Sequence, residues 1–123
     1  MTFGWYDTYN TIYFKQLIMI TTTTPNIEGR PVQQYLGIVS AESIIGANIF
    51  KDLLAGIRDI AGGRSETYER VVDEARTNAM NELVKKAQSI GANAIVGIDL
   101  DFETIGAGSS MLMVLATGTA VRI

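Results

Sequence analysis

The chain has 123 residues, 47% of them hydrophobic, and a formal net charge of −3. That length suits one domain. The lysine and arginine residues form no basic stripe of the kind that is typical of a nucleic-acid-binding protein. Cysteine and histidine are both absent, which excludes disulfides, the usual zinc and copper ligand sets, and catalysis by a histidine base or a cysteine nucleophile. No apolar run approaches the ~20 residues that cross a bilayer, and the N-terminus lacks the pattern of a secretory signal. We therefore expect a cytoplasmic protein that binds neither membrane nor nucleic acid.

Residues 1–18 differ in composition from the rest of the chain, residues 19–123. Six of the ten aromatic residues fall within this short segment: Phe3, Trp5, Tyr6, Tyr9, Tyr13 and Phe14. One interpretation is a simple extension upstream of Met19. The other is an arm whose aromatic rings pack on a neighbouring subunit.

Two strands are expected before the first helix. Residues 17–23, "LIMITTT", are rich in β-branched side chains. A loop with two prolines and a glycine follows at residues 24–31, and residues 32–40 form the second predicted strand. Gly37 interrupts that strand, where it marks a bulge or a close approach of another backbone.

Two helices are expected next, over residues 48–63 and 66–90. The second has an apolar stripe at spacings of three and four, formed by Tyr68, Val71, Val72, Ala75, Ala79, Leu83, Ala87 and Ile90. Acidic side chains in its first turn and lysines near its end complement the helix dipole. Its small residues indicate close packing, and Gly91 is expected to end it.

Two more strands close the chain, at residues 94–105 and 111–123, joined by the turn "GAGSS". The last strand is apolar on both faces, with Met111, Met113 and Leu115 on one face and three apolar residues between and after them on the other. In a small protein one sheet face is normally wet, so this pattern predicts that another subunit covers the second face. The order β-β-α-α-β-β predicts an α+β fold with a small antiparallel sheet and one long amphipathic helix.

The segments "TTTPNIEGRPV", "YLGIV", "GANIFKDLLAGIRDIAGGRS", "GANAIVGIDLDFE" and "SMLMVLATGTAV" resemble the YbjQ family, also called UPF0145, which carries the label "putative heavy-metal-binding domain". The resemblance runs from Met19 to Ile123. It implies a dodecin-like subunit that assembles into a homopentameric ring. It implies no activity, because the family is uncharacterised.

Three acidic residues, Asp99, Asp101 and Glu103, form the candidate metal site. They alternate along a strand, so their side chains share one face with Cα atoms ~6.6–6.8 Å apart. Carboxylate oxygens suit Ca²⁺, Mg²⁺ or Mn²⁺, and a divalent cation is the candidate cofactor, but this spacing needs help from another strand to chelate one ion. The other interpretation is a solvated sheet face. The nearby Met111 and Met113 offer thioethers that bind Cu(I), although methionine more commonly fills gaps in cores.

A second candidate site binds a small ligand through Glu28, Arg30, Arg64 and Ser65. Arg64 and Ser65 follow a double glycine and precede a helix, as in loops that bind phosphate. The structural interpretation is that the glycines cap one helix and Ser65 caps the next, and glutamates early in that helix repel anions.

Three functions remain open. The first is a ring-forming homo-oligomer without catalytic residues that binds a small ligand or cation. The second is a hydrolase or transferase whose active site is assembled at a subunit interface, and the third is a purely structural oligomer.

Overall fold

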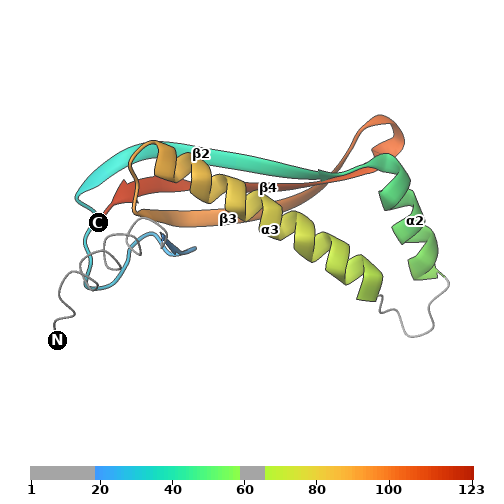
Figure 1. Cartoon of the computed structure of the whole chain (residues 1–123), viewed down its shortest axis with the longest axis horizontal. Coiled ribbons are helices and arrows are strands. Elements are labelled where there is room, and N and C mark those ends of the chain that lie inside the picture. The colour runs from blue at the N-terminus through green and yellow to red at the C-terminus, as the bar shows by residue number, and fades with distance from the viewer. Residues whose placement is uncertain (1–18, 59–65) are drawn as a thin grey trace, which may run out of the picture. The chain divides into compact units, whose positions relative to one another are not determined.

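The computed structural model describes residues 19–58 and 66–123, which form six main elements (Figure 1). In chain order they are β1 (Ile20–Thr21), β2 (Gln34–Ile45), α2 (Ala47–Arg58), α3 (Glu66–Ser89), β3 (Ala94–Ile105) and β4 (Met111–Arg122), with a short 3₁₀ turn at Ala107–Ser109. The predicted order of elements and the α+β class are confirmed. Residues 59–63 of the first predicted helix lie outside the described residues.

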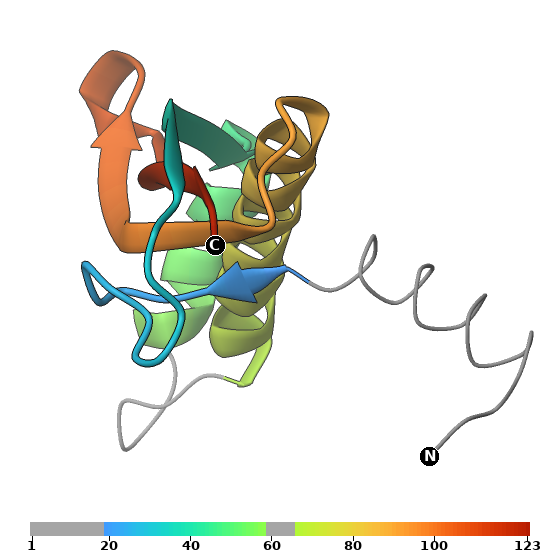
Figure 2. The same ribbon diagram turned by 90° about the vertical axis from the view of Figure 1, so that its left-hand side faces the viewer.

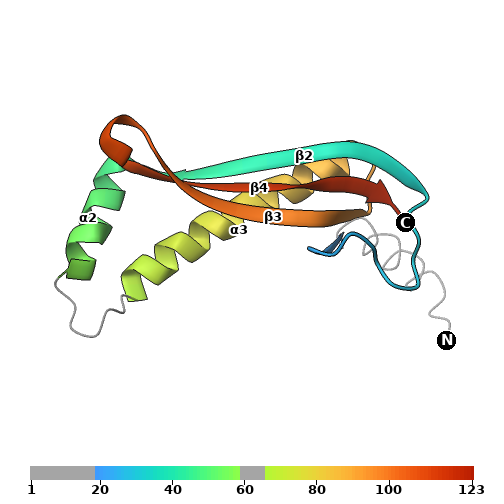
Figure 3. The ribbon, with the colours of Figure 1, turned by 180° about the vertical axis from the view of Figure 1, so that it is seen from behind.

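The strands form one four-stranded sheet in the order β1-β3-β4-β2, with β4 between β3 and β2 (Figures 1 and 3). β1 pairs parallel to β3, with Ile20 opposite Ala94 and Thr21 opposite Ile95 (Figure 2). The prediction of an antiparallel sheet is therefore wrong at β1, and the sheet is mixed. A parallel pair needs a long crossover, and the chain between β1 and β3 supplies it with β2 and both helices.

Two predicted strands also have different limits in the structure. Within the described residues, the strand predicted at 17–23 is reduced to the two residues of β1. β2 begins two residues later than predicted and continues to Ile45. The last five residues of β2, "AESII", mix polar and apolar side chains, so the sequence did not predict this extension. A strand with one face in water needs apolar residues only at alternate positions.

The chain divides into two compact units. The first consists of Met1–Val39, Val84–Ile98 and Gly118–Ile123, and the second of Ser40–Leu83 and Asp99–Thr117. The three long strands and α3 contribute residues to both. We call them the first and second units and describe each by itself.

In the first unit, apolar side chains are buried on both faces of the strands. One face holds a cluster of buried residues with partly buried neighbours packed on it: Ala94, Val96 and Val121, with Ile20, Ile27, Val32 and Ile123. On the other face, a Cβ added to Gly118 would lie 2.6 Å from Ile95 Cγ2 and 3.1 Å from Ile98 Cγ1. Ile95 and Ile98 share a face although they are three residues apart, because Gly97 between them has φ +62° and breaks the alternation.

In the second unit, burial is confined to one face of β4. Leu112, Val114 and Ala116 are buried, whereas Met111, Met113 and Leu115 between them are half-buried. The predicted division of this strand into two faces is thus confirmed. α3 lies along the unit's strands (Figures 1 and 3) and has three buried residues there, Ala75, Ala79 and Leu83. The small side chains allow the helix backbone to approach the sheet closely.

Gly91 ends α3, as predicted. It has φ +90°, and the N–H groups of Ile90, Gly91 and Ala92 donate to carbonyl oxygens of the last helical turn at 3.0–3.2 Å. Across the described residues, neither helix combines the length and the apolar character that a membrane span requires.

Candidate functional site

The acidic row of Asp99, Asp101 and Glu103 lies on β3 in the second unit, and all three residues are exposed. β1 pairs with Ala94 and Ile95, and the row begins after Ile98. Charged side chains beside a sheet edge discourage pairing with another chain. Among the described residues, the row therefore lies on a part of β3 that β1 does not pair with, where charged side chains are common.

Asp99 and Glu103 both act on Asp101, which lies between them in the row. The pKa of Asp101 is raised above its ordinary value of 3.8, first by a hydrogen bond with the Asp99 carboxyl, then by repulsion from the Asp99 charge, by partial loss of hydration and by repulsion from Glu103. A hydrogen bond between two carboxyl groups requires that one of them hold a proton. When both are ionised, a cation is the other partner that can hold them together.

Two neighbouring carboxylates do not complete a metal site. Within residues 19–58 and 66–123, no three His, Cys, Asp or Glu side chains gather closely enough to hold one ion. A Ca²⁺ ion takes six to eight oxygen ligands. The Asp99–Asp101 pair can therefore supply only part of a coordination shell, and the rest would have to come from water or another copy of the chain.

Of the second candidate site, Glu28 and Arg30 lie in the first unit, where threonine hydroxyls fix the loop after β1. The Thr24 hydroxyl donates to the Asn26 carbonyl oxygen at 2.6 Å, so its single proton is used. In the 2.7 Å contact between the two hydroxyls, Thr22 is therefore the donor and Thr24 Oγ1 the acceptor. Thr22 Oγ1 in turn accepts the Thr24 N–H at 3.1 Å.

Backbone hydrogen bonds attach this loop to β3. The Thr22 N–H donates to the Ile95 carbonyl oxygen at 3.0 Å, and the carbonyl oxygens of Thr22 and Thr24 accept from Ile98 and Gly97 at 3.0 and 2.9 Å. The protons of both hydroxyls are thus engaged in holding the loop. Neither threonine is poised as a nucleophile, which requires a base to accept its proton.

An open groove of about 580 Å³ runs along this loop, lined by Ile20, Thr22, Thr24, Asn26, Ile27 and Glu28. Glu28 lies in its wall. Arg30 is exposed and follows a turn in which its N–H donates to the Ile27 carbonyl oxygen at 3.1 Å. The groove combines one carboxylate with polar oxygens over an apolar floor, a composition that suits a small polar or cationic ligand. The sequence alone does not indicate that the hydroxyls of Thr22 and Thr24 are connected.

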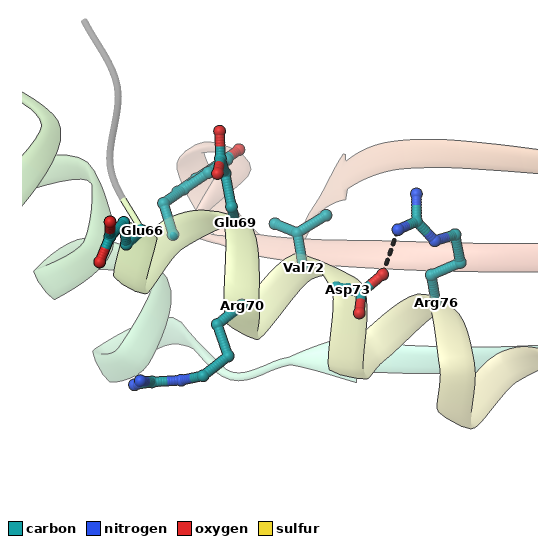
Figure 4. A pocket seen from close by; sticks show the side chains of 7 residues that line it. Glu66, Glu69, Arg70, Val72, Asp73 and Arg76 are labelled. Atoms are coloured by element: carbon teal, nitrogen blue, oxygen red, sulfur yellow. Dashed lines mark hydrogen bonds and ion pairs between the residues drawn. The ribbon is translucent and has the colours of Figure 1, made fainter.

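Arg64 and Ser65 lie outside the described residues, so their predicted role stays a prediction. The described start of α3 forms a shallow surface lined by charged side chains of both signs (Figure 4). There Arg76 donates to the Asp73 carboxylate, and both side chains are about half exposed, at 46% and 61%. Such exposed pairs contribute little to stability, and this surface offers no clear preference for an anion.

Comparison with known proteins bears on the whole domain. The model of the YbjQ family, described as "Putative heavy-metal-binding", matches residues 19–123. A solved structure from Pediococcus pentosaceus, a protein of unknown function from the DUF74 family, is 21% identical with a TM-score of 0.57, over 85% of this chain and 97% of that chain. At this identity the second match supports the fold alone.

Proposed function

Because this chain belongs to the YbjQ family, we propose that it is a self-assembling subunit without catalytic residues that binds a divalent cation between copies. The proposal rests chiefly on the Asp99–Asp101 pair. These exposed carboxylates share a strand face, and a bound cation would reduce the repulsion that helps to raise the pKa of Asp101. The family's description as heavy-metal-binding supports cation binding, although the oxygen donors of this row favour hard cations such as Mg²⁺, Ca²⁺ or Mn²⁺.

Assembly would complete the coordination shell. A ring, which the resemblance to dodecin-like homopentamers implies, brings equivalent carboxylates of several copies toward one axis. The half-buried Met111, Met113 and Leu115 supply an apolar surface for such contacts. Met111 is better suited to packing than to binding Cu(I), because its Cε atom lies over Gly106.

The test combines native mass spectrometry with thermal unfolding. We expect the purified protein to run as an oligomer whose mass falls by one or more metal ions after chelation. Adding Mn²⁺ to the chelated protein at about 100 times the dissociation constant would stabilise it by about 2.7 kcal/mol, seen as a higher melting temperature.

Two single substitutions distinguish loss of a cation ligand in this row from the general loss of one negative charge. Asp101→Asn should abolish the rise in melting temperature with Mn²⁺ while the oligomer persists. Glu42→Gln removes the same charge from an exposed position of β2 outside the row and should leave the rise intact. Equal responses of the two variants would rule out the Asp99–Asp101 pair, and a monomer at micromolar concentration would rule out assembly.

A further inference from the structure

A pocket of about 280 Å³ lies in the second unit, between the beginning of α2 and the turn that joins β3 to β4 (Figure 1). Two segments that are far apart in the sequence form its wall. α2 supplies Asn48, Lys51 and Leu54 among others, and the turn supplies Ser109 and Ser110. The volume lies just below the range of about 300–1,000 Å³ that is usual for sites of drug-sized ligands, so the pocket suits a smaller molecule.

The polar side chains of this pocket favour an anion. Among the described residues that line it, Lys51 is the only one that carries a charge, and the first turn of α2 contains no acidic residue. Asn48 adds an amide donor, and Ser109 and Ser110 add hydroxyl donors. A carboxylate has only acceptor oxygens and can use all of these donors.

Part of the wall is apolar and in contact with water. Phe50 is 5% exposed and belongs to the core, but Leu54 is 38% exposed and Ala47 is also exposed. A ligand with a hydrocarbon body would remove this surface from water, which is favourable. A compact inorganic anion would leave the surface wet, so the wall favours an organic anion.

Ser109 has an unusual backbone conformation at the pocket. Its φ is +56°, and it is the only non-glycine residue with a positive φ in the described part of the chain. Gly108 before it has φ +65°, a conformation that glycine adopts without strain. Strained residues cluster at functional sites, and the hydroxyl of Ser109 gives this position a use that glycine lacks.

We propose that this pocket binds a small organic anion, a carboxylate with a short aliphatic body. The carboxylate pairs with Lys51 and accepts hydrogen bonds from the two serines, and the aliphatic body lies on Ala47 and Leu54. This inference is independent of cation binding, because none of the described residues that line the pocket belongs to the acidic row.

The test titrates the full chain with octanoate at neutral pH. Octanamide is the matched probe with the same body and no charge, and inorganic phosphate is the matched anion without a body. We expect octanoate to bind at least about tenfold more tightly than either, since the loss of one charged hydrogen bond costs about this factor. Calorimetry measures the affinities. In nitrogen-15 NMR spectra, octanoate should shift the amide signals of Asn48, Ser109 and Ser110.

Substitutions of lysine test the role of the charge. Lys51→Gln should weaken octanoate binding by about tenfold, whereas Lys51→Arg keeps the charge and should retain most of the affinity. The control is Lys85→Gln, which removes the same charge from an exposed position of α3 in the first unit and should leave the affinity unchanged.

Ser109→Gly separates ligand binding from stability. Glycine relieves the backbone strain, so the variant should have a higher melting temperature than the wild type. It also removes a hydroxyl donor, so octanoate should bind several-fold more weakly. A residue with only a structural role would change the melting temperature and leave the affinity for octanoate unchanged.

Three results would overturn the proposal. The first is that octanoate does not bind at millimolar concentration, or shifts only amide signals away from the pocket. The second is that octanamide or phosphate binds as tightly as octanoate. The third is that Lys51→Gln and Lys85→Gln have the same affinity for octanoate.

Discussion

The two units differ in how far apolar side chains are buried on the two faces of their strands. In the first unit, Ala94, Val96 and Val121 are buried on one face, and Ile95 and Ile98 surround Gly118 on the other. In the second unit, the alternate residues of β4 are buried and half-buried. The difference follows from the chain: the segment around Ile27 and Val32 packs on the first unit, whereas a comparable segment over Met113 and Leu115 is not found among the described residues. Among the described residues, the first unit buries apolar side chains on both faces of its strands, and the second unit leaves one face of β4 only half-buried.

The largest expected effect is the loss of a fully buried side chain on β3, compared with the loss of a half-buried one on β4. Ile95→Ala in the first unit should lower the free energy of unfolding by about 2–5 kcal/mol, because it leaves a cavity at a fully buried site. Leu115→Ala in the second unit should cost only about 1 kcal/mol in a single chain, because Leu115 is half-buried. Urea unfolding at low protein concentration measures both. Equal losses would show that the second face is as fully covered as the first.

The next prediction concerns the close contact at Gly118. Gly118→Ala should cost about 1–3 kcal/mol, because the new methyl group would overlap Ile95 Cγ2. In the Ile95→Ala background the same substitution should cost much less, since the methyl group then occupies vacated space. Urea unfolding of both single variants and the double variant gives this coupling. Strict additivity would contradict the packing that we describe.

An effect of similar size is expected where Asn93 fixes the end of β4 in the first unit. Its side-chain amide donates to the Ile123 carbonyl oxygen at 3.1 Å and accepts the Ile123 N–H at 2.8 Å. Asn93→Ala removes both hydrogen bonds and should destabilise the protein by about 1–3 kcal/mol. Asn93→Asp keeps the acceptor and loses the donor, so its melting temperature should lie between those of the wild type and Asn93→Ala.

The fourth prediction is a pH dependence in the second unit. The pKa of Asp101 is raised, mainly through its hydrogen bond with Asp99, so the folded protein binds this proton more tightly than the unfolded chain. The resulting stabilisation is fully present below the ordinary value of 3.8 and is lost as the pH rises through the raised value. Urea midpoints measured from acidic to neutral pH should show this decline. Asp101→Asn should flatten it, and an unchanged slope would mean that other groups cause it.

The smallest effect is expected for the exposed pair on α3. Arg76→Ala should change the free energy of unfolding by less than about 1 kcal/mol, because both partners are solvated. Thermal unfolding at low and high salt measures this. A larger loss would indicate that Arg76 packs against another chain, which would extend the incomplete surface of the second unit to its helix.

Much of the fold could be predicted from local patterns. The limits of β3 and the end of α3 at Gly91 agree with the sequence, because strict alternation and a helix-ending glycine are local features. The parallel pairing of β1 could not be predicted in this way. Two residues carry little periodicity, and their direction depends on a crossover made by the rest of the chain.

The candidate site divides along the same line. The sequence alone determined that Asp99, Asp101 and Glu103 share a face, since side chains alternate along any strand. It also determined that cysteine and histidine chemistry is absent. Only the tertiary structure decided that the hydroxyl protons of Thr22 and Thr24 are used within their loop, that backbone hydrogen bonds attach this loop to β3, and that Ile38 lies exposed while Val39 is buried. The attachment of the loop to β3 and the burial of Val39 depend on segments far apart in the chain, and a local pattern carries no information about which segments meet.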